Sequence, residues 1–208
     1  EPTEPLGLDT IYVSNENEPH YYPRLPMLDK TDSYMGGPIE ISTGDGQTVV
    51  AVVPWGGQLI ALKERTAYRI AESEVGFYHY QAMPLEGCVG RDAAVLTPFG
   101  LVWLSEKGLL LLTREEQQVW IGQPVQSESN RMDAETQLVH SRGSVVVSYE
   151  DSGGDPVALT WQQEGGWQGV HDIPASCWFE DIDGRLYFGR TDAAGIGELY
   201  LHETGLLD

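Results

Sequence analysis

The stretch CVGRDAAVLTPFGLVWLSEKGLLLLTREEQQVWIG, residues 88–122, decides the fold. Its apolar runs are short, and turn residues interrupt them: Pro98-Phe99-Gly100 separates the first two runs and Glu106-Lys107-Gly108 separates the next two. An amphipathic helix needs a longer uninterrupted stretch, whereas short runs between glycine and proline are typical of strands. The stretch therefore predicts an antiparallel β-meander.

The central run of this meander is apolar on both faces. Side chains alternate between the two faces of a strand, so Leu101 and Trp103 share one face while Val102 and Leu104 share the other. A strand with two apolar faces is covered on both sides. We expect the same of the valine-rich run at residues 49–53.

Apolar strands that open after a glycine recur at regular intervals. They start at Gly57, Gly100, Gly143 and Gly184, with spacings of 43, 43 and 41 residues. A period of about 40–45 residues filled with short strands is typical of a four-stranded propeller blade, because one blade cannot bury both of its faces alone. We therefore expect an all-β chain that forms a β-propeller or part of one.

The expected organisation is an extended segment followed by blades. Residues 1–38 are irregular and contain one strand, and residues 39–208 hold about four repeats, with closure of the ring left open. The blades are predicted at residues 39–72, 76–122, 136–170 and 171–208. The polar residues 123–135 are expected to connect two blades, with a short helix around Glu128 to Glu135 as an alternative.

The charge balance limits the partners of the chain. Its 208 residues include 12 Lys and Arg against 32 Asp and Glu, which gives a formal net charge of −20. An acidic surface repels phosphates, so we expect no specific binding of nucleic acid. Two interpretations stay open: a solvated acidic surface suited to solubility or a salty milieu, or an acidic wall past which DNA slides.

Cysteine usage and hydropathy exclude some classes of protein. Cys88 and Cys177 have no metal-binding spacing, and we expect each to be a small buried hydrophobic side chain, while pairing between them stays open. Neither a long apolar run nor a charged-then-apolar leader is present, so no membrane span and no signal peptide are expected. The chain begins at Glu1 without methionine, which suggests a processed product or a piece of a longer protein.

Catalytic motifs are missing from the sequence. It contains no HExxH, no GxSxG and no Walker loop, and its five histidines are isolated from one another. We therefore predict no catalytic residue and no cofactor.

Acidic turns are the candidate metal ligands. Carboxylates cluster in the loop from Asp151 to Asp155 and in Asp181-Ile182-Asp183-Gly184, and a hard cation such as calcium prefers oxygen ligands of this kind. The second loop lacks the twelfth-position glutamate of an EF-hand. Ordinary turn-forming carboxylates are the alternative. The candidate ligands are Asp45, Asp151, Asp155, Asp181 and Asp183.

Three stretches carry a resemblance to a known group of proteins. GGQLIALKERTAYRIAE, EGCVGRDAAVLTPFGLVWLSEKGLLLL and GRLYFGRTDAAGIGELYLHE resemble, in this order, virion proteins of tailed bacteriophages whose propeller domain lies in the tail nozzle or head-to-tail region. The resemblance covers residues 57–112 well and 140–202 loosely. It implies a structural role without catalysis in a ring-shaped assembly located in the virion, with six identical subunits as the expected number and an acidic channel for DNA. Such proteins are usually much longer than 208 residues.

The sequence is compatible with three functions. The leading hypothesis is a non-enzymatic virion protein that acts through contacts with identical chains and with other virion proteins. The alternatives are an extracellular propeller that binds carbohydrate or protein, and a propeller glycoside hydrolase, which needs paired carboxylates. Converging carboxylates would favour the hydrolase, an exposed aromatic ring beside Asp or Asn would favour carbohydrate binding, and large buried patches between identical chains would favour the ring.

Overall fold

The computed structural model describes residues 9–13, 37–42, 44–72, 78–169, 171–173, 175–191 and 197–202. Within these ranges the chain is all-β: seventeen strands are joined by turns, one 3-10 turn and one α-helix of four residues. The chain divides into two compact units, Glu1–Cys88 and Val89–Asp208. Among the residues described, no helix is long and apolar enough to cross a membrane.

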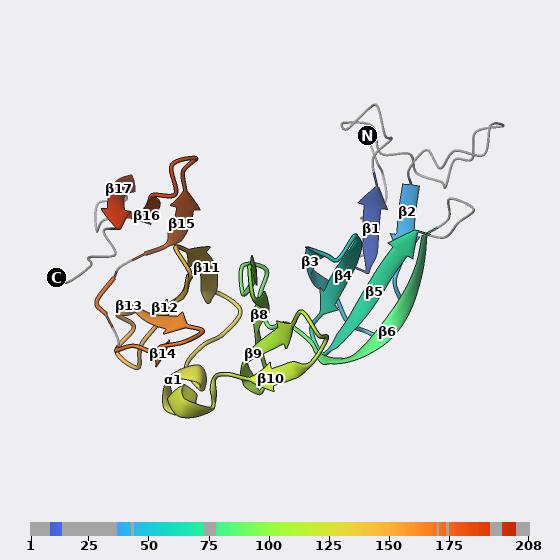
Figure 1. The fold of residues 1–208 in the computed structure, drawn as a ribbon, viewed down its shortest axis with the longest axis horizontal. Coiled ribbons are helices and arrows are strands. Elements are labelled where there is room, and N and C mark those ends of the chain that lie inside the picture. Colours follow the sequence, from blue (N-terminus) through green and yellow to red (C-terminus); the bar gives the residue numbers. More distant parts are fainter. Residues whose placement is uncertain are drawn as a thin grey trace. The chain divides into compact units, whose positions relative to one another are not determined.

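The first unit holds a four-stranded and a two-stranded antiparallel sheet (Figure 1). The four-stranded sheet has the order β3 (Val49–Trp55), β4 (Gln58–Lys63), β5 (Thr66–Glu72) and β6 (Tyr78–Glu86). The small sheet pairs β1 (Thr10–Val13) with β2 (Gly37–Glu40). Most of the N-terminal segment predicted at residues 1–38 lies outside the described residues.

The predicted composition of the first blade is wrong at both ends. Residues 39–42 begin the predicted blade at 39–72 but do not form a strand of its sheet, because Ile39 and Ile41 pack onto one face of the β3–β6 sheet, with Ala61, Tyr68 and Ile70. Their backbone pairs with β1, and the Ile41 N–H bonds to the Asp9 carbonyl. β6, expected to open the second blade, is the fourth strand of the first sheet.

The valine-rich run is also less covered than expected. β3 is an edge strand, and its burial alternates: Val53 is 7% exposed, whereas Val52 is 41% exposed. Burial on both faces occurs one strand further in, where residues 60–63 of β4 are all buried. The apolar run alone could not separate an edge strand from an inner one.

The second unit begins with the predicted meander, which the structure confirms. Its strands are β7 (Ala94–Thr97), β8 (Gly100–Ser105), β9 (Gly108–Thr113) and β10 (Gln118–Trp120), paired in chain order. All six residues of β8 are buried, as its two apolar faces predict. Gly100 has a φ of +154°, and a Cβ there would overlap the carbonyl oxygen of Leu112, so the β7–β8 turn requires glycine.

The connecting segment contains less helix than the alternative prediction placed there. A 3-10 turn, Gln123–Val125, leads into α1 (Gln126–Ser129), so the helix begins two residues before the expected stretch and overlaps only its first two residues. The next residues form a turn in which the Asp133 N–H bonds to Thr136 Oγ1 and the Glu135 N–H bonds to Asp133 Oδ1. Such local side-chain bonds compete with the helical backbone pattern and end the helix.

Two further meanders complete the described chain. The third sheet is β11 (Gln137–Ser141), β12 (Ser144–Glu150), β13 (Pro156–Gln162) and β14 (Gly166–Trp167). The fourth has three strands within the described residues, β15 (Cys177–Glu180), β16 (Leu186–Thr191) and β17 (Gly197–His202). These strands lie where the sequence predicts them, and a shared core of Val146, Ala158 and Leu186 joins the two sheets.

The glycine-led stretches occupy equivalent positions in the fold. Each contributes the second strand of its sheet, and these strands begin at Gln58, Gly100, Ser144 and Leu186. Each large sheet is built from consecutive strands (Figure 1). The fold is therefore all-β and consists of successive antiparallel meanders of a propeller-like kind.

Candidate functional site

The second unit contains a pocket at the place where the segments that lead into β7, β11 and β15 come together. Its volume is about 1040 Å³, just above the roughly 300–1,000 Å³ that is usual for ligand sites. Residues that precede β7, β11 and β15 form part of its wall, and the rest comes from the first residue of β11, the end of β12, the start of β13 and Arg190 of β16. We call it the acidic pocket, after its five carboxylates. They are Asp92, Asp133, Glu135, Glu150 and Asp155.

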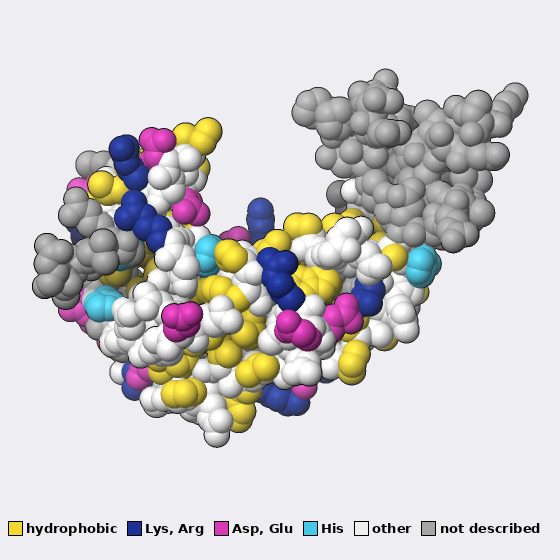
Figure 2. Space-filling view, in the orientation of Figure 1, with side chains coloured by type: hydrophobic (Ala, Val, Ile, Leu, Met, Phe, Trp, Pro, Cys, Tyr) yellow, Lys and Arg dark blue, Asp and Glu magenta, His cyan; other side chains and the backbone are white. Residues whose placement is uncertain are grey.

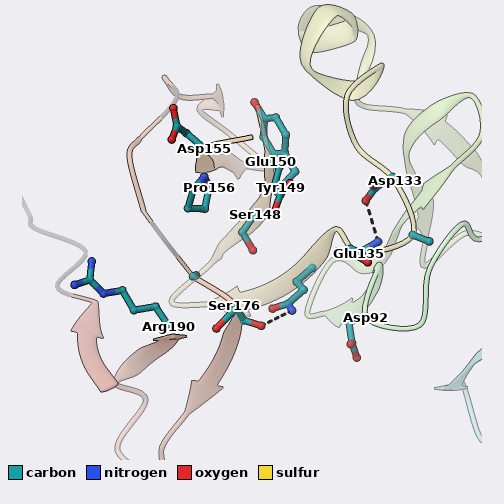
Figure 3. A pocket seen from close by; sticks show the side chains of 13 residues that line it. Asp92, Asp133, Glu135, Ser148, Tyr149, Glu150, Asp155, Pro156, Ser176 and Arg190 are labelled. Carbon is teal, nitrogen blue, oxygen red and sulfur yellow. Dashed lines mark hydrogen bonds between the residues drawn. The ribbon is translucent and has the colours of Figure 1, made fainter. Parts of the chain in front are cut away.

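Hydrogen bonds of the backbone and of side chains hold together the segments that form the wall of the acidic pocket. The Leu138 N–H bonds to the Asp92 carbonyl, which ties the residues before β7 to β11. Gln137 Nε2 donates to the Ser176 carbonyl at 2.7 Å, which ties β11 to the residue before β15 (Figure 3). In Figure 3, Asp133 and Glu135 lie on one side of the pocket and Asp155 and Arg190 lie on the other. The pocket is thus assembled from segments far apart in sequence.

Tyr149 forms part of the pocket wall and anchors the neighbouring helix. The residue is 6% exposed, and its hydroxyl donates to Glu128 Oε2 at 2.7 Å. Glu128 Oε2 also accepts from Arg131 Nη1 at 2.9 Å. Burial, followed by the hydrogen bond to Glu128, raises the pKa of Tyr149 well above its usual range. The phenol therefore stays protonated and holds α1 against β12.

Arg190 is the cationic residue in the pocket wall, and its charge is compensated by its own sheet. Its Nε donates to Glu198 Oε2 at 2.7 Å, and its guanidinium lies 5.1 Å from the centre of the Tyr200 ring. Hydrogen bonds from Tyr200 and then Arg190 lower the pKa of Glu198, so this carboxyl is ionised. The five pocket carboxylates consequently outweigh the positive charge in the wall.

The five predicted metal ligands are not brought together. Asp45 lies in the first unit, where its carboxylate accepts from Lys63 Nζ at 3.0 Å through both oxygens. The other four lie in the second unit, and of these only Asp155 lines the acidic pocket. Within the described ranges, no group of three or more His, Cys, Asp and Glu side chains has a metal-binding arrangement.

The acidic loops instead form turns that their own aspartates cap. Asp151 Oδ1 accepts from the N–H groups of Gly153 at 2.7 Å and Asp155 at 3.0 Å. Asp181 Oδ1 accepts from Asp183 at 2.9 Å and Arg185 at 2.8 Å in the same way. These backbone bonds lower the pKa of both carboxyls. The turn-forming interpretation therefore accounts for the aspartates that begin each loop.

The two cysteines differ in their surroundings. Cys88 is buried, as expected, whereas the prediction is wrong for Cys177, which is exposed on β15. Neither cysteine forms a disulfide bond in the structure. Among the coloured residues of Figure 2, acidic side chains are dispersed over the visible face, which agrees with a solvated acidic surface.

Sequence reasoning missed most of the pocket. Asp92, Asp133, Glu135 and Glu150 carry no motif, and they stand next to strands whose packing brings them together only in the folded chain. One weak signal was present: Asp92, Glu135 and Ser176 each stand a few residues before the first strand of a sheet. Because the equivalent ends of stacked meanders meet, that position was the one to inspect.

Comparison with known proteins gives distant structural likenesses and no family. No protein-family model matches the chain, and no curated protein matches it. The chain is similar to a protein assigned as a 6-phosphogluconolactonase from Bacteroides uniformis, with a TM-score of 0.49 and 12% identity over 85% of this chain and 62% of that one. It is also similar to a streptogramin B lyase, with a TM-score of 0.46 and 14% identity over 93% of this chain and 68% of that one.

A third likeness is to PorZ, a surface component of the type-IX secretion system of Porphyromonas gingivalis, with a TM-score of 0.40, 10% identity, and coverage of 74% of this chain and 28% of that one. The chain thus spans less than two thirds of the length of the first and third of these proteins. Because the first two are named as enzymes, the prediction that this chain is not an enzyme is contradicted, and we withdraw it.

Proposed function

We propose that the chain supplies blades of a β-propeller, with a period of about 43 residues, that binds a positively charged ligand in the acidic pocket. The observation that carries the proposal is the composition of the wall. Five carboxylates from three segments line the pocket together with one guanidinium, and Glu198 already compensates that guanidinium. All five acidic residues are exposed, so a ligand can reach them.

The side chains of the pocket wall and the volume of the pocket indicate which class of ligand fits. Carbohydrate sites use an exposed aromatic ring as a platform, but Tyr149, the aromatic residue in the wall, is 6% exposed. Carboxylates gathered in a concave wall concentrate negative potential and attract cations. The size of the pocket suits several residues of a peptide, and a basic protein segment is the ligand we propose.

Calorimetry with a hexalysine peptide tests this proposal. Asp92→Asn combined with Glu135→Gln should weaken binding roughly twofold to thirtyfold, since an exposed ion pair contributes about 0.2–1 kcal/mol. The matched control, Glu106→Gln with Glu115→Gln, removes the same charge from exposed turns outside the pocket and should bind like the unmodified chain. Equal binding by both double variants would contradict the proposal.

The convergence of carboxylates also favours the propeller glycoside hydrolase considered from the sequence, because glycoside hydrolysis uses two carboxyl groups beside the scissile bond. A screen of oligosaccharides for newly released reducing ends tests this second candidate. Release that Glu135→Gln abolishes and Glu115→Gln preserves would support it. Release that persists in both variants would place catalysis outside the pocket.

A structural role in a tailed-phage virion is the third proposal. It requires extensive contact between identical chains, and it is supported by an exposed apolar face on the last sheet, where Phe179 is 60% and Leu199 is 70% exposed. The mass of the native assembly, measured by light scattering, tests it. A closed ring of about six chains would support a virion ring, and a monomeric protein would contradict it.

A further inference from the structure

Ser148 of β12 places a buried hydroxyl in the wall of the acidic pocket. The residue is 5% exposed, whereas the five pocket carboxylates are all exposed. In Figure 3 its side chain points from the strand toward the space that the labelled residues surround. The carboxylates therefore form the solvent-facing part of the wall, and Ser148 belongs to the part that lies deeper.

The Ser148 hydroxyl acts as an acceptor within the protein but not as a donor. Its Oγ accepts from Trp178 Nε1–H at 2.8 Å. A serine hydroxyl also carries one O–H donor, and among the residues that the structure describes none accepts from it. A buried donor that stays unpaired costs free energy. A ligand that brings an acceptor to Ser148 is therefore favoured over one that does not.

The other side chains of the wall that carry donors each donate to an acceptor of the protein. Two of them donate to carboxylates and two donate to backbone carbonyls. They are Gln137, Tyr149, Ser176 and Arg190. The ionised carboxylates of the wall offer acceptors alone. The wall thus suits a ligand that carries several positive groups and also presents an acceptor to Ser148.

We propose that Ser148 makes the pocket prefer a peptide to other polycations, by donating its O–H to a backbone carbonyl of the bound basic segment. This role rests on the proposed function of the acidic pocket and adds a residue that recognises the backbone of the ligand. The exposed carboxylates attract polycations of every kind. A polyamine with protonated amines carries donors and no acceptor, so it would leave the buried O–H unpaired.

Calorimetry with hexalysine and with the polyamine spermine tests the role of Ser148. Ser148→Ala should raise the Kd for hexalysine about twofold to tenfold, which is the usual effect of one hydrogen bond. The Kd for spermine should change by less than about twofold, because spermine has no acceptor for the hydroxyl.

Ser144→Ala is the matched control. Ser144 lies on the same strand, is 6% exposed and accepts from Gln162 Nε2 at 3.0 Å, but it is not part of the pocket wall. This variant should bind both ligands like the unmodified chain. Trp178→Phe removes the same bond between sheets as Ser148→Ala and keeps the hydroxyl, so it should weaken hexalysine less. Circular dichroism should show that all three variants remain folded.

The outcomes separate the role of Ser148 from the proposed function. An unmodified chain that binds neither ligand would contradict both. If Asp92→Asn with Glu135→Gln weakens both ligands while Ser148→Ala weakens both alike, or neither, the proposed function would stand and the role of Ser148 would be wrong. An equal loss of hexalysine binding in Trp178→Phe would also overturn this role, because the loss would then come from the packing of the two sheets.

Discussion

Lys63 is a buried lysine with a defined set of partners. Its side chain is fully buried, and Nζ lies 3.0 Å from both carboxylate oxygens of Asp45 and 3.3 Å from the Ser42 carbonyl oxygen. It also lies 5.9 Å from the centre of the Tyr68 ring. A buried charge is tolerated only where it is paired and hydrogen-bonded, so Asp45 stabilises the fold of the first unit.

Asp45→Asn should lower the unfolding midpoint in urea at neutral pH, because Lys63 loses its counter-charge. The hydrogen bond from Lys63, followed by that from the Gln47 N–H, lowers the pKa of Asp45 in the folded state. A lowered pKa gives stability that is present above the unfolded pKa and is lost as pH falls through the folded value. The difference between the unmodified chain and the variant should therefore shrink as the pH is lowered below about 4.

Asp183→Asn is the control for this pair. Asp183 is 67% exposed and its nearest cationic partner, Arg185, is 4.0 Å away, so its removal should leave the urea midpoint nearly unchanged at every pH. If the two variants gave the same pH profile, the Lys63–Asp45 pair would not be the source of the stability.

Gly90→Ala should destabilise the second unit by roughly 1–3 kcal/mol, the usual cost of overpacking. A Cβ on Gly90 would overlap the carbonyl oxygen of Ala134, and backbone cannot move aside as a side chain can. Ala134 belongs to the pocket wall, so binding of hexalysine should weaken as well. Gly169→Ala is the control, since a Cβ there meets nothing within 4 Å. Equal unfolding free energies for the two variants would refute the close contact.

At the scale of elements, tryptophan N–H groups connect neighbouring meanders. Trp178 on β15 donates to Ser148 Oγ on β12, and Trp167 on β14 donates to the Ile121 carbonyl after β10 at 2.7 Å. Each bond joins two sheets that share no backbone ladder. These indoles therefore help to fix the orientation of one sheet against the next, which apolar packing alone does not do.

Trp178→Phe should reduce the unfolding free energy by about 1 kcal/mol, because the ring contacts are largely kept while the hydrogen bond to the buried Ser148 is lost. Urea denaturation followed by circular dichroism measures the change. Trp120→Phe, at a residue that is 45% exposed, should have a smaller effect. A larger loss for Trp120→Phe would show that the inter-sheet bond contributes little.

The sequence predicted a strand and its neighbours correctly where both faces of the strand carried apolar residues. The apolar faces of β8 and the flanking turn residues were sufficient for the meander, and all six residues are buried. It failed at β2 and β6, because a short apolar run does not reveal whether its partner is the strand before it or the strand after it. The acidic pocket and the Lys63–Asp45 pair were beyond its reach, since they depend on which turns and strands meet in space.

At the scale of the whole molecule, the net charge of −20 opposes compaction. Raising NaCl from 0.05 to 0.5 M should raise the thermal midpoint, because the distance over which charges repel falls from more than about 10 Å to less than half of that. Replacing NaCl with KCl should give the same rise. A midpoint that falls with salt would mean that ion pairs, not repulsion, dominate the electrostatic free energy.

The acidic pocket is lined mainly by strand ends and the residues that lead into strands, whereas the buried residues of β8 and β9 lie within the strands and outside the pocket. Stability and recognition are therefore encoded at different positions of the sequence. Asp92, Glu135 and Asp155 can be exchanged without opening a cavity in the core. A library randomised at these positions should retain folded members in high proportion, so one scaffold could acquire new ligands by surface change alone.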